Sequence, residues 1–222
     1  MTVPHACHRI GHGGASALVA ANTLASFDAA RDIGVDMVEF DVRAWRGELV
    51  LAHTVFHARQ GGNVPLRDAL AHLSARSFAG IELNVDLKHV GCEAALLAAL
   101  RRAGLLQRTL ISCQVAAVLD RVRALEPRAR TGISVGGRVA RLSRRWRNWR
   151  AQVLTGVAGR RWDALMVQHR LVDVDLLDQV VRRGGRLYAW TVNDLPAIDR
   201  LAALGVHGIA TADPRLFAQQ AH

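Results

Sequence analysis

Residues 23–42 read TLASFDAARDIGVDMVEFDV, and this stretch contains one complete connection from a helix to a strand. Apolar residues recur at helical spacing as far as Ile33, and Gly34 follows in the position of a left-handed helix C-cap. The next residues, 37–42, form a short and mostly apolar run that is typical of a buried parallel strand. We therefore predict a helix over residues 23–33 that leads into a strand over residues 37–42.

The same alternation of short apolar runs and helical segments continues along all 222 residues. It predicts strands over residues 5–10, 37–42 with a hairpin extension over 48–53, 80–87, 109–113, 131–135, 164–167, 186–191 and 208–210. It predicts helices over residues 23–33, 65–75, 93–103, 115–125, 174–183 and 196–204. Eight strands joined by crossover helices favour an α/β fold, a (βα)8 TIM barrel that forms a single domain over residues 1–222. An open doubly wound sheet is the alternative, because a strand count does not establish closure.

The composition limits the class of protein and its partners. A formal net charge of +10 favours anionic partners, but the sequence has no recognition-helix or aromatic-interleaved motif, so we expect no nucleic acid binding. No apolar run approaches the roughly 20 residues of a membrane-spanning helix. The first residues do not resemble a secretory signal, and the three cysteines show no zinc or disulfide spacing, so we expect a cytoplasmic protein.

Acidic side chains interrupt two of the predicted strands. Glu39 and Asp41 lie two residues apart, so their side chains project to the same face of one strand. Asp86 and Lys88 repeat this spacing on the next strand. Because buried carboxylates are costly unless they are neutralised, we predict that Glu39, Asp41 and Asp86 bind a divalent cation, while Lys88 meets a phosphate or one of those carboxylates. A buried salt-bridge network without a ligand is the alternative interpretation.

Two histidines stand at predicted strand ends beside these acids. His12 follows the first strand, and His53 ends the hairpin extension of the second. A pair of imidazoles suits phosphodiester cleavage, because one can accept a proton from the nucleophile while the other donates a proton to the leaving oxygen. We therefore predict that His12 and His53 are catalytic.

Residues 11–54, GHGGASALVAANTLASFDAARDIGVDMVEFDVRAWRGELVLAHT, resemble the opening of the glycerophosphodiester phosphodiesterase family. The resemblance implies catalytic histidines at His12 and His53 and metal ligands at Glu39 and Asp41. It also places the family's conserved asparagine at Asn22.

Later segments extend the resemblance over nearly the whole chain. LNVDLK resembles the segment that holds the third metal ligand and a phosphate-binding lysine, here Asp86 and Lys88, and LYAWTVND places Trp190 at the wall of the site. The family resemblance implies a (βα)8 barrel that uses a divalent metal, Mg²⁺ or Ca²⁺.

Four positions depart from the family pattern. Gly13 stands where the family has arginine and Ala21 where it has glutamate, so we expect Arg9 to supply the missing cation beside the phosphate. Thr54 replaces an aspartate, and Asp86 replaces a glutamate. The segment over residues 53–65 is also too short for the cap that many members insert there, which suggests an open mouth and a bulkier or lipid-bearing substrate.

We expect metal-dependent hydrolysis of small-molecule glycerophosphodiesters or of lysophospholipid headgroups, an activity of lipid metabolism. Gly13 and the segment Asp86-Leu87-Lys88 also resemble phospholipases D of the sphingomyelinase D type, which form a cyclic phosphate. A third hypothesis is a barrel that binds a phosphate ligand but has lost catalysis, since Gly13, Ala21 and Thr54 replace functional residues of the family.

A basic segment over residues 138–150 runs from Arg138 to Arg150 and carries tryptophans at Trp146 and Trp149. Its apolar residues recur at three-and-four spacing, which predicts an amphipathic helix. The helix either buries its apolar stripe on the outside of the barrel or binds an anionic membrane surface, which would make the protein peripheral to a membrane.

Overall fold

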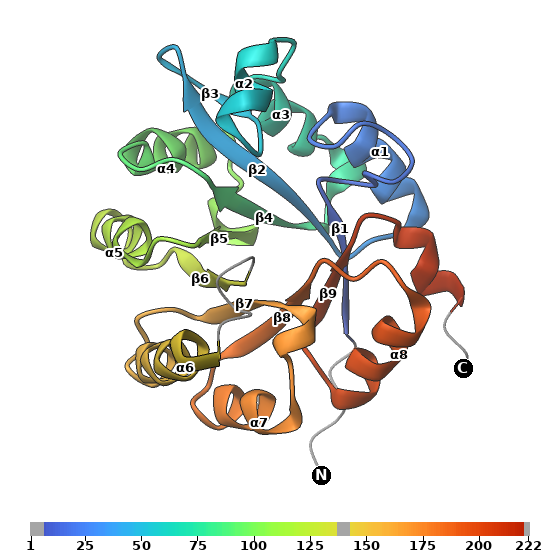
Figure 1. Cartoon of the computed structure of the whole chain (residues 1–222). Coiled ribbons are helices and arrows are strands. Elements are labelled where there is room, and N and C mark those ends of the chain that lie inside the picture. Colours follow the sequence, from blue (N-terminus) through green and yellow to red (C-terminus); the bar gives the residue numbers. More distant parts are fainter. Residues whose placement is uncertain (1–6, 137–142, 220–222) are drawn as a thin grey trace.

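The computed structural model describes residues 7–136 and 143–219, with the backbone alone for residues 143–148. Eight parallel strands form a closed barrel, because β1 pairs with β2 on one side and with β9 on the other (Figure 1). The strands are β1 (His8–His12), β2 (Met37–Trp45), β3 (Glu48–Leu51), β4 (Glu82–Leu87), β5 (Thr109–Cys113), β6 (Arg130–Val135), β7 (Ala164–Gln168), β8 (Arg186–Trp190) and β9 (Gly208–Thr211). Closure confirms the predicted TIM barrel and excludes the open sheet; β3 lies outside the barrel and pairs antiparallel with β2.

Helices surround this barrel on its outside (Figure 1). The α-helices are α1 (Leu24–Ile33), α2 (Val55–Gln60), α3 (Leu66–Leu73), α4 (Glu93–Arg102), α5 (Ala116–Leu125), α6 (Ser143–Ala158), α7 (Val174–Arg182) and α8 (Leu195–Leu204). The short 3₁₀ helices are η1 (Arg76–Phe78), η2 (Leu106–Arg108), η4 (His169–Leu171) and η5 (Pro214–Gln219). No helix in the described part of the chain is long and apolar enough to cross a membrane.

Two predicted boundaries were wrong in ways that affect the site. The first strand runs through His12 instead of ending at residue 10, so His12 belongs to the strand itself. The hairpin strand ends at Leu51, so His53 lies beyond its end. The helix α2 was not predicted; it begins because the Thr54 hydroxyl accepts a hydrogen bond from the backbone N–H of His57 at 3.1 Å, as an N-cap does.

The basic segment lies partly outside the described residues, since residues 138–142 are not among them. In the described part of α6, Trp149 packs against the core and Val153 is buried in it. Arg150 forms ion pairs with Asp173 and Asp175. These contacts support an outer barrel helix, and membrane binding through residues 138–150 remains a prediction.

The core consists of a layer between barrel and helices and a smaller cluster inside the barrel. Phe27 of α1 and Phe40 of β2 are fully buried in the outer layer, with ring centroids 5.4 Å apart. This contact fixes α1, which begins two residues after Asn22, against the barrel.

We expect Phe27→Ala to lower the free energy of unfolding by about 3–5 kcal/mol, because it leaves a cavity in a close-packed layer. Urea unfolding followed by circular dichroism measures the change. Val181 provides a control, because it is 48% exposed and Val181→Ala removes much less buried apolar surface. A loss below about 1 kcal/mol for Phe27→Ala would contradict the assigned packing.

Candidate active site

Strand register brings the predicted site residues into adjacent rows inside the barrel. His12 of β1 pairs with Glu39 of β2, and Glu39 pairs with Asn84 of β4. One step further along the same strands, Asp41 pairs with Asp86. The side chains of these alternating residues face the barrel interior at the carboxyl ends of the strands, where TIM barrels hold their active sites.

The three carboxylates form one buried cluster. Oxygen atoms of Glu39, Asp41 and Asp86 all lie within 4.8 Å of one another, and the residues are only 4%, 4% and 9% exposed. One oxygen of Asp86, Oδ1, is buried and has no hydrogen-bond partner. Three acidic oxygen donors with an unpartnered atom match the ligand preference of a hard divalent cation, so these residues fit the predicted metal.

Lys88 compensates part of this negative charge. Its Nζ donates to Asp86 Oδ2 at 2.5 Å and lies 3.2 Å from Asp41 Oδ1. Burial alone would lower the pKa of Lys88, but Asp86 and Asp41 raise it, so the amine stays charged. Burial, followed by the charges of Asp41 and Asp86, raises the pKa of Glu39 well above its ordinary value. One lysine therefore does not neutralise three carboxylates, and a further positive charge is needed for all three to ionise together.

Asp41 is held in place from two sides. The Asn22 side-chain amide donates to Asp41 Oδ2 at 2.9 Å, and its oxygen accepts from the Asp41 backbone N–H at 2.9 Å. His53 Nδ1 lies 3.1 Å from Asp41 Oδ1. Burial would raise the pKa of Asp41, but the His53 hydrogen bond and the Lys88 charge lower it. Asp41 thus stays ionised, and its contact fixes the His53 ring.

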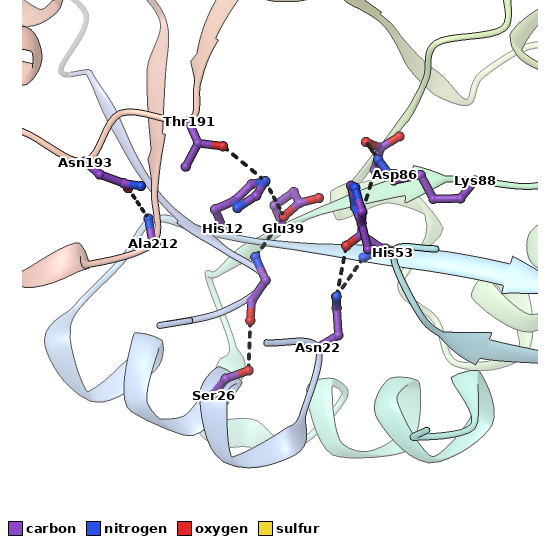
Figure 2. A network of polar contacts seen from close by, with 12 residues as sticks. His12, Asn22, Ser26, Glu39, His53, Asp86, Lys88, Thr191, Asn193 and Ala212 are labelled. Atoms are coloured by element: carbon purple, nitrogen blue, oxygen red, sulfur yellow. Dashed lines mark hydrogen bonds and ion pairs between the residues drawn. The ribbon is translucent and has the colours of Figure 1, made fainter. Parts of the chain in front are cut away.

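His12 stands on the other side of Glu39 in the same site (Figure 2). Its Nε2 lies 3.9 Å from Glu39 Oε2 and 3.4 Å from the Thr191 hydroxyl. Partial desolvation lowers the pKa of His12. The ring is therefore neutral near pH 7 and able to accept a proton.

These groups line a pocket of about 230 Å³ at the centre of the barrel. Its lining residues are His12, Glu39, His53, Asn84, Asp86, Lys88, Ser112, Gln114, Ser134, Met166, Trp190 and Ala210. Trp190 forms part of the wall, as expected, and its buried Nε1 has no hydrogen-bond partner. The pocket is therefore lined by the carboxylates of Glu39 and Asp86, the imidazoles of His12 and His53, the Lys88 amine and polar atoms without a hydrogen-bond partner.

Arg9 does not join this group, which corrects the expectation that it meets a phosphate. Its guanidinium forms two hydrogen bonds with Asp36, at 2.9 and 3.0 Å. Asp36 directly precedes β2, at the opposite end of the barrel from the pocket. Arg9 also lies one residue from Ile10, which faces the barrel interior, so its side chain projects to the outside. Among the described residues that line the pocket, Lys88 is the single lysine or arginine.

Gly13 and Ala21 lie next to each other in space. They stand where the family that the sequence resembles has an arginine and a glutamate. A Cβ atom on Gly13 would lie 3.1 Å from the Ala21 Cβ. The Gly13 backbone N–H donates to Glu39 Oε2 at 2.8 Å, so this position still contacts the site through its main chain. The two small residues fit each other and leave no unpaired charge.

Sequence reasoning missed one partner of His12, Thr191, and several residues that line the pocket. The Thr191 hydroxyl lies 3.4 Å from His12 Nε2, although the two residues are 179 positions apart in the sequence. No pattern of neighbouring residues predicts that contact. Ser112 and Ser134 are small polar residues in otherwise apolar strands, and this exception to the strand pattern was the available signal. Gln114, directly after β5, could have been found as a polar residue at a strand end.

Comparisons with known proteins agree with this geometry. A model of the Glycerophosphoryl diester phosphodiesterase family matches residues 12–61 and 76–216. Locally, the chain is 43% identical over 51 residues to glycerophosphodiester phosphodiesterase GDPD4 of Arabidopsis thaliana. That match covers 23% of this chain and 16% of the plant protein.

Solved structures share the fold. A glycerophosphodiester phosphodiesterase from Parabacteroides distasonis matches 98% of this chain and 99% of its own, with a TM-score of 0.79 and 18% identity. An Oleispira antarctica phosphodiesterase, solved in complex with the product sn-glycerol-3-phosphate, matches 95% of this chain and 94% of its own, with a TM-score of 0.72 and 21% identity. At these identities the structural likeness establishes the barrel alone.

Proposed function

The chain belongs to the glycerophosphoryl diester phosphodiesterase family of phosphoric diester hydrolases, and from this premise we propose that it hydrolyses glycerophosphodiesters or lysophospholipid headgroups with a divalent metal. The observation that carries the proposal is the cluster of three buried carboxylates, two of which, Glu39 and Asp86, line one pocket together with His12 and His53. The sn-glycerol-3-phosphate bound to the Oleispira antarctica relative supports a glycerophosphate group as the recognised part of the substrate. The whole chain acts as one barrel domain in this proposal.

Glu39, Asp41 and Asp86 would hold the metal, Mg²⁺ or Ca²⁺. When bound, the cation supplies positive charge that stabilises the phosphoryl oxygens in the transition state. Lys88 Nζ, already within 3.2 Å of two of these acids, supplies a second positive charge to the phosphate. Trp190 closes one wall and keeps part of the pocket free of water.

His12 and His53 share the acid and base work. Neutral His12 can accept a proton from the attacking oxygen, and the imidazolium so formed can later return that proton; Glu39 lies beside the ring. Asp41 fixes His53 through Nδ1, which leaves Nε2 for proton transfer. Both rings line the same pocket, as acid–base catalysis at one phosphorus atom requires.

The two other hypotheses differ in their products. In a reaction of the sphingomyelinase D type, a substrate hydroxyl attacks phosphorus and a cyclic phosphate appears; in hydrolysis, water attacks and glycerol phosphate appears. A barrel that only binds phosphate yields neither product. The family match favours hydrolysis over both alternatives.

Turnover of glycerophosphocholine with added Mg²⁺ or Ca²⁺ tests the proposal. Products separated by ³¹P NMR distinguish a linear phosphomonoester from a cyclic phosphate. Release of glycerol phosphate supports the hydrolase, and a cyclic product supports the sphingomyelinase D alternative. Unchanged substrate with every divalent cation tried would contradict both catalytic hypotheses.

Asn22 is not one of the proposed metal ligands, but it contacts one of them, so its substitution tests the metal site. It has a positive φ of 61°, so Asn22→Gly keeps the backbone conformation while it removes the amide that braces Asp41. We expect metal affinity to fall about 10–100-fold, as for other groups that orient metal ligands. Isothermal titration with Mg²⁺ or Ca²⁺ measures the change. Equal affinity in the variant and the wild-type protein would show that the Asp41 brace is irrelevant to the metal.

A further inference from the structure

Exposed apolar side chains gather at one end of the barrel. The described part of the chain exposes seven large apolar side chains, and five of them lie in the segments that follow β1, β3, β4 and β5. These five, which we name the apolar rim, are Leu18, Val55, Phe56, Val90 and Val115. Phe56 is 66% exposed and Val90 is 63% exposed. Single exposed apolar residues are ordinary on a protein surface, but their concentration at one end is not.

The apolar rim lies beside the active-site pocket. Val55 comes two residues after His53 in the chain, and Val115 comes directly after Gln114, and both His53 and Gln114 line the pocket. Val55 and Phe56 form the first turn of α2, which stands at the periphery of the barrel (Figure 1). The rim therefore surrounds part of the opening through which a substrate must enter.

A second cavity, of about 250 Å³, joins the rim to the site. Val90 and Val115 line it, and it shares His53, Lys88 and Gln114 with the active-site pocket. Arg43 also lines this cavity, and its buried Nε has no hydrogen-bond partner. The second cavity is thus lined both by exposed apolar side chains, Val90 and Val115, and by Lys88, whose Nζ contacts the carboxylate cluster.

The segments that carry the rim side chains contain basic residues but no acidic ones. Residues 13–23, 52–67, 88–92 and 114–119, which carry the five rim side chains, contain no aspartate or glutamate. Exposed basic groups do lie there, including Arg59 on α2. By contrast, the segments after β7, β8 and β9 carry acidic residues, among them Asp173. An acid-free surface with apolar and basic side chains complements an anionic lipid surface, which attracts cations and accepts apolar side chains at its headgroup boundary.

We propose that the apolar rim seats the active-site end of the barrel on the surface of an anionic lipid bilayer. Phe56 and Val55 enter the headgroup boundary, and the second cavity leads a lipid-borne phosphodiester from that surface toward His53 and Lys88. The part concerning the substrate rests on the proposed function, whereas docking to the bilayer does not. A second copy of this chain is the other occupant that an apolar surface could take.

The test is sedimentation of the full chain with vesicles of phosphatidylglycerol and phosphatidylcholine, compared with vesicles of phosphatidylcholine alone. We expect binding to the anionic vesicles that weakens as salt rises. The double variant Val55→Ser and Phe56→Ser is expected to lower the partition coefficient by about tenfold or more, since two apolar side chains no longer leave water. Val90→Ser, in a separate segment, is expected to lower it in the same direction.

Val181→Ser is the matched control, because Val181 is also an exposed valine but lies on α7. It should bind vesicles as the wild-type protein does. Unchanged binding in the rim variants, or no binding of the wild-type protein to anionic vesicles, overturns the proposal. A wild-type dimer that the rim variants dissociate, without vesicle binding, would assign the rim to a second copy instead and would also overturn it.

Turnover of water-soluble glycerophosphocholine is measured in the same variants and separates this inference from the proposed function. The double variant Val55→Ser and Phe56→Ser should retain that turnover, which also shows that it folds, while it loses activity on lysophospholipid held in anionic vesicles. If no phosphodiester is cleaved by the wild-type protein, the proposed function fails, and vesicle binding with circular dichroism still decides the docking proposal.

Discussion

His12→Ala is expected to lower kcat for glycerophosphocholine by about 10²–10⁴-fold, the usual contribution of a positioned acid–base group. Nε2 of His12 lies 3.9 Å from Glu39 Oε2, inside the pocket that would hold the phosphodiester. The other imidazole among the described residues that line the pocket, His53, is hydrogen-bonded to Asp41 and is therefore not expected to replace His12. The measurement is kcat at saturating substrate and metal.

His72→Ala is the matched control for this variant. His72 lies on α3, where its Nε2 pairs with Asp28 at 3.0 Å, outside the pocket. Loss of that imidazole should leave kcat within a few fold of the wild-type value. If His12→Ala keeps more than a tenth of the wild-type kcat while it folds normally, His12 is not a catalytic group in this protein.

Removal of divalent cations is expected to abolish turnover and to lower the thermal stability of the barrel. A cation at 100 times its Kd stabilises the folded state by about 2.7 kcal/mol. For a chain of this size that corresponds to a rise in Tm of about 5–10 °C when Mg²⁺ or Ca²⁺ is added to chelator-treated protein. The physical reason is that the cation neutralises three carboxylates which Lys88 alone leaves undercompensated. Differential scanning calorimetry measures this shift without any assay of activity.

Asp86→Asn tests whether the proposed ligands cause the shift. The variant removes the carboxylate whose Oδ1 has no partner, so we expect most of the metal-induced rise in Tm to disappear. Asp36→Asn is the control, since Asp36 pairs with Arg9 at the other end of the barrel and should leave the metal-induced rise intact. An equal rise in both variants would mean that the cation binds elsewhere.

Several features of this protein follow from short-range sequence patterns. The alternation of helical segments with short apolar runs depends on backbone periodicity alone, and it was sufficient to predict the barrel class. The two-residue spacing of Glu39 and Asp41 predicted that both face the interior, because strand side chains alternate. The same spacing of Asp86 and Lys88 on the next strand then predicted the cluster of Glu39, Asp41 and Asp86, and the family resemblance implied the same residues.

Tertiary structure decided the rest. Closure of the barrel places Thr191 beside His12, and strand register places Asp41 opposite Asp86. No pattern among neighbouring residues in the sequence indicates either pairing. Arg9 was misplaced because the face of its side chain depends on where β1 ends, and pairing with β2 and β9 fixes that end. The periodicity of apolar residues depends on residues that are close in the chain, so it can be recognised in the sequence. Convergence of distant side chains depends on strand pairing across the whole chain, and so it exists only once the barrel has closed.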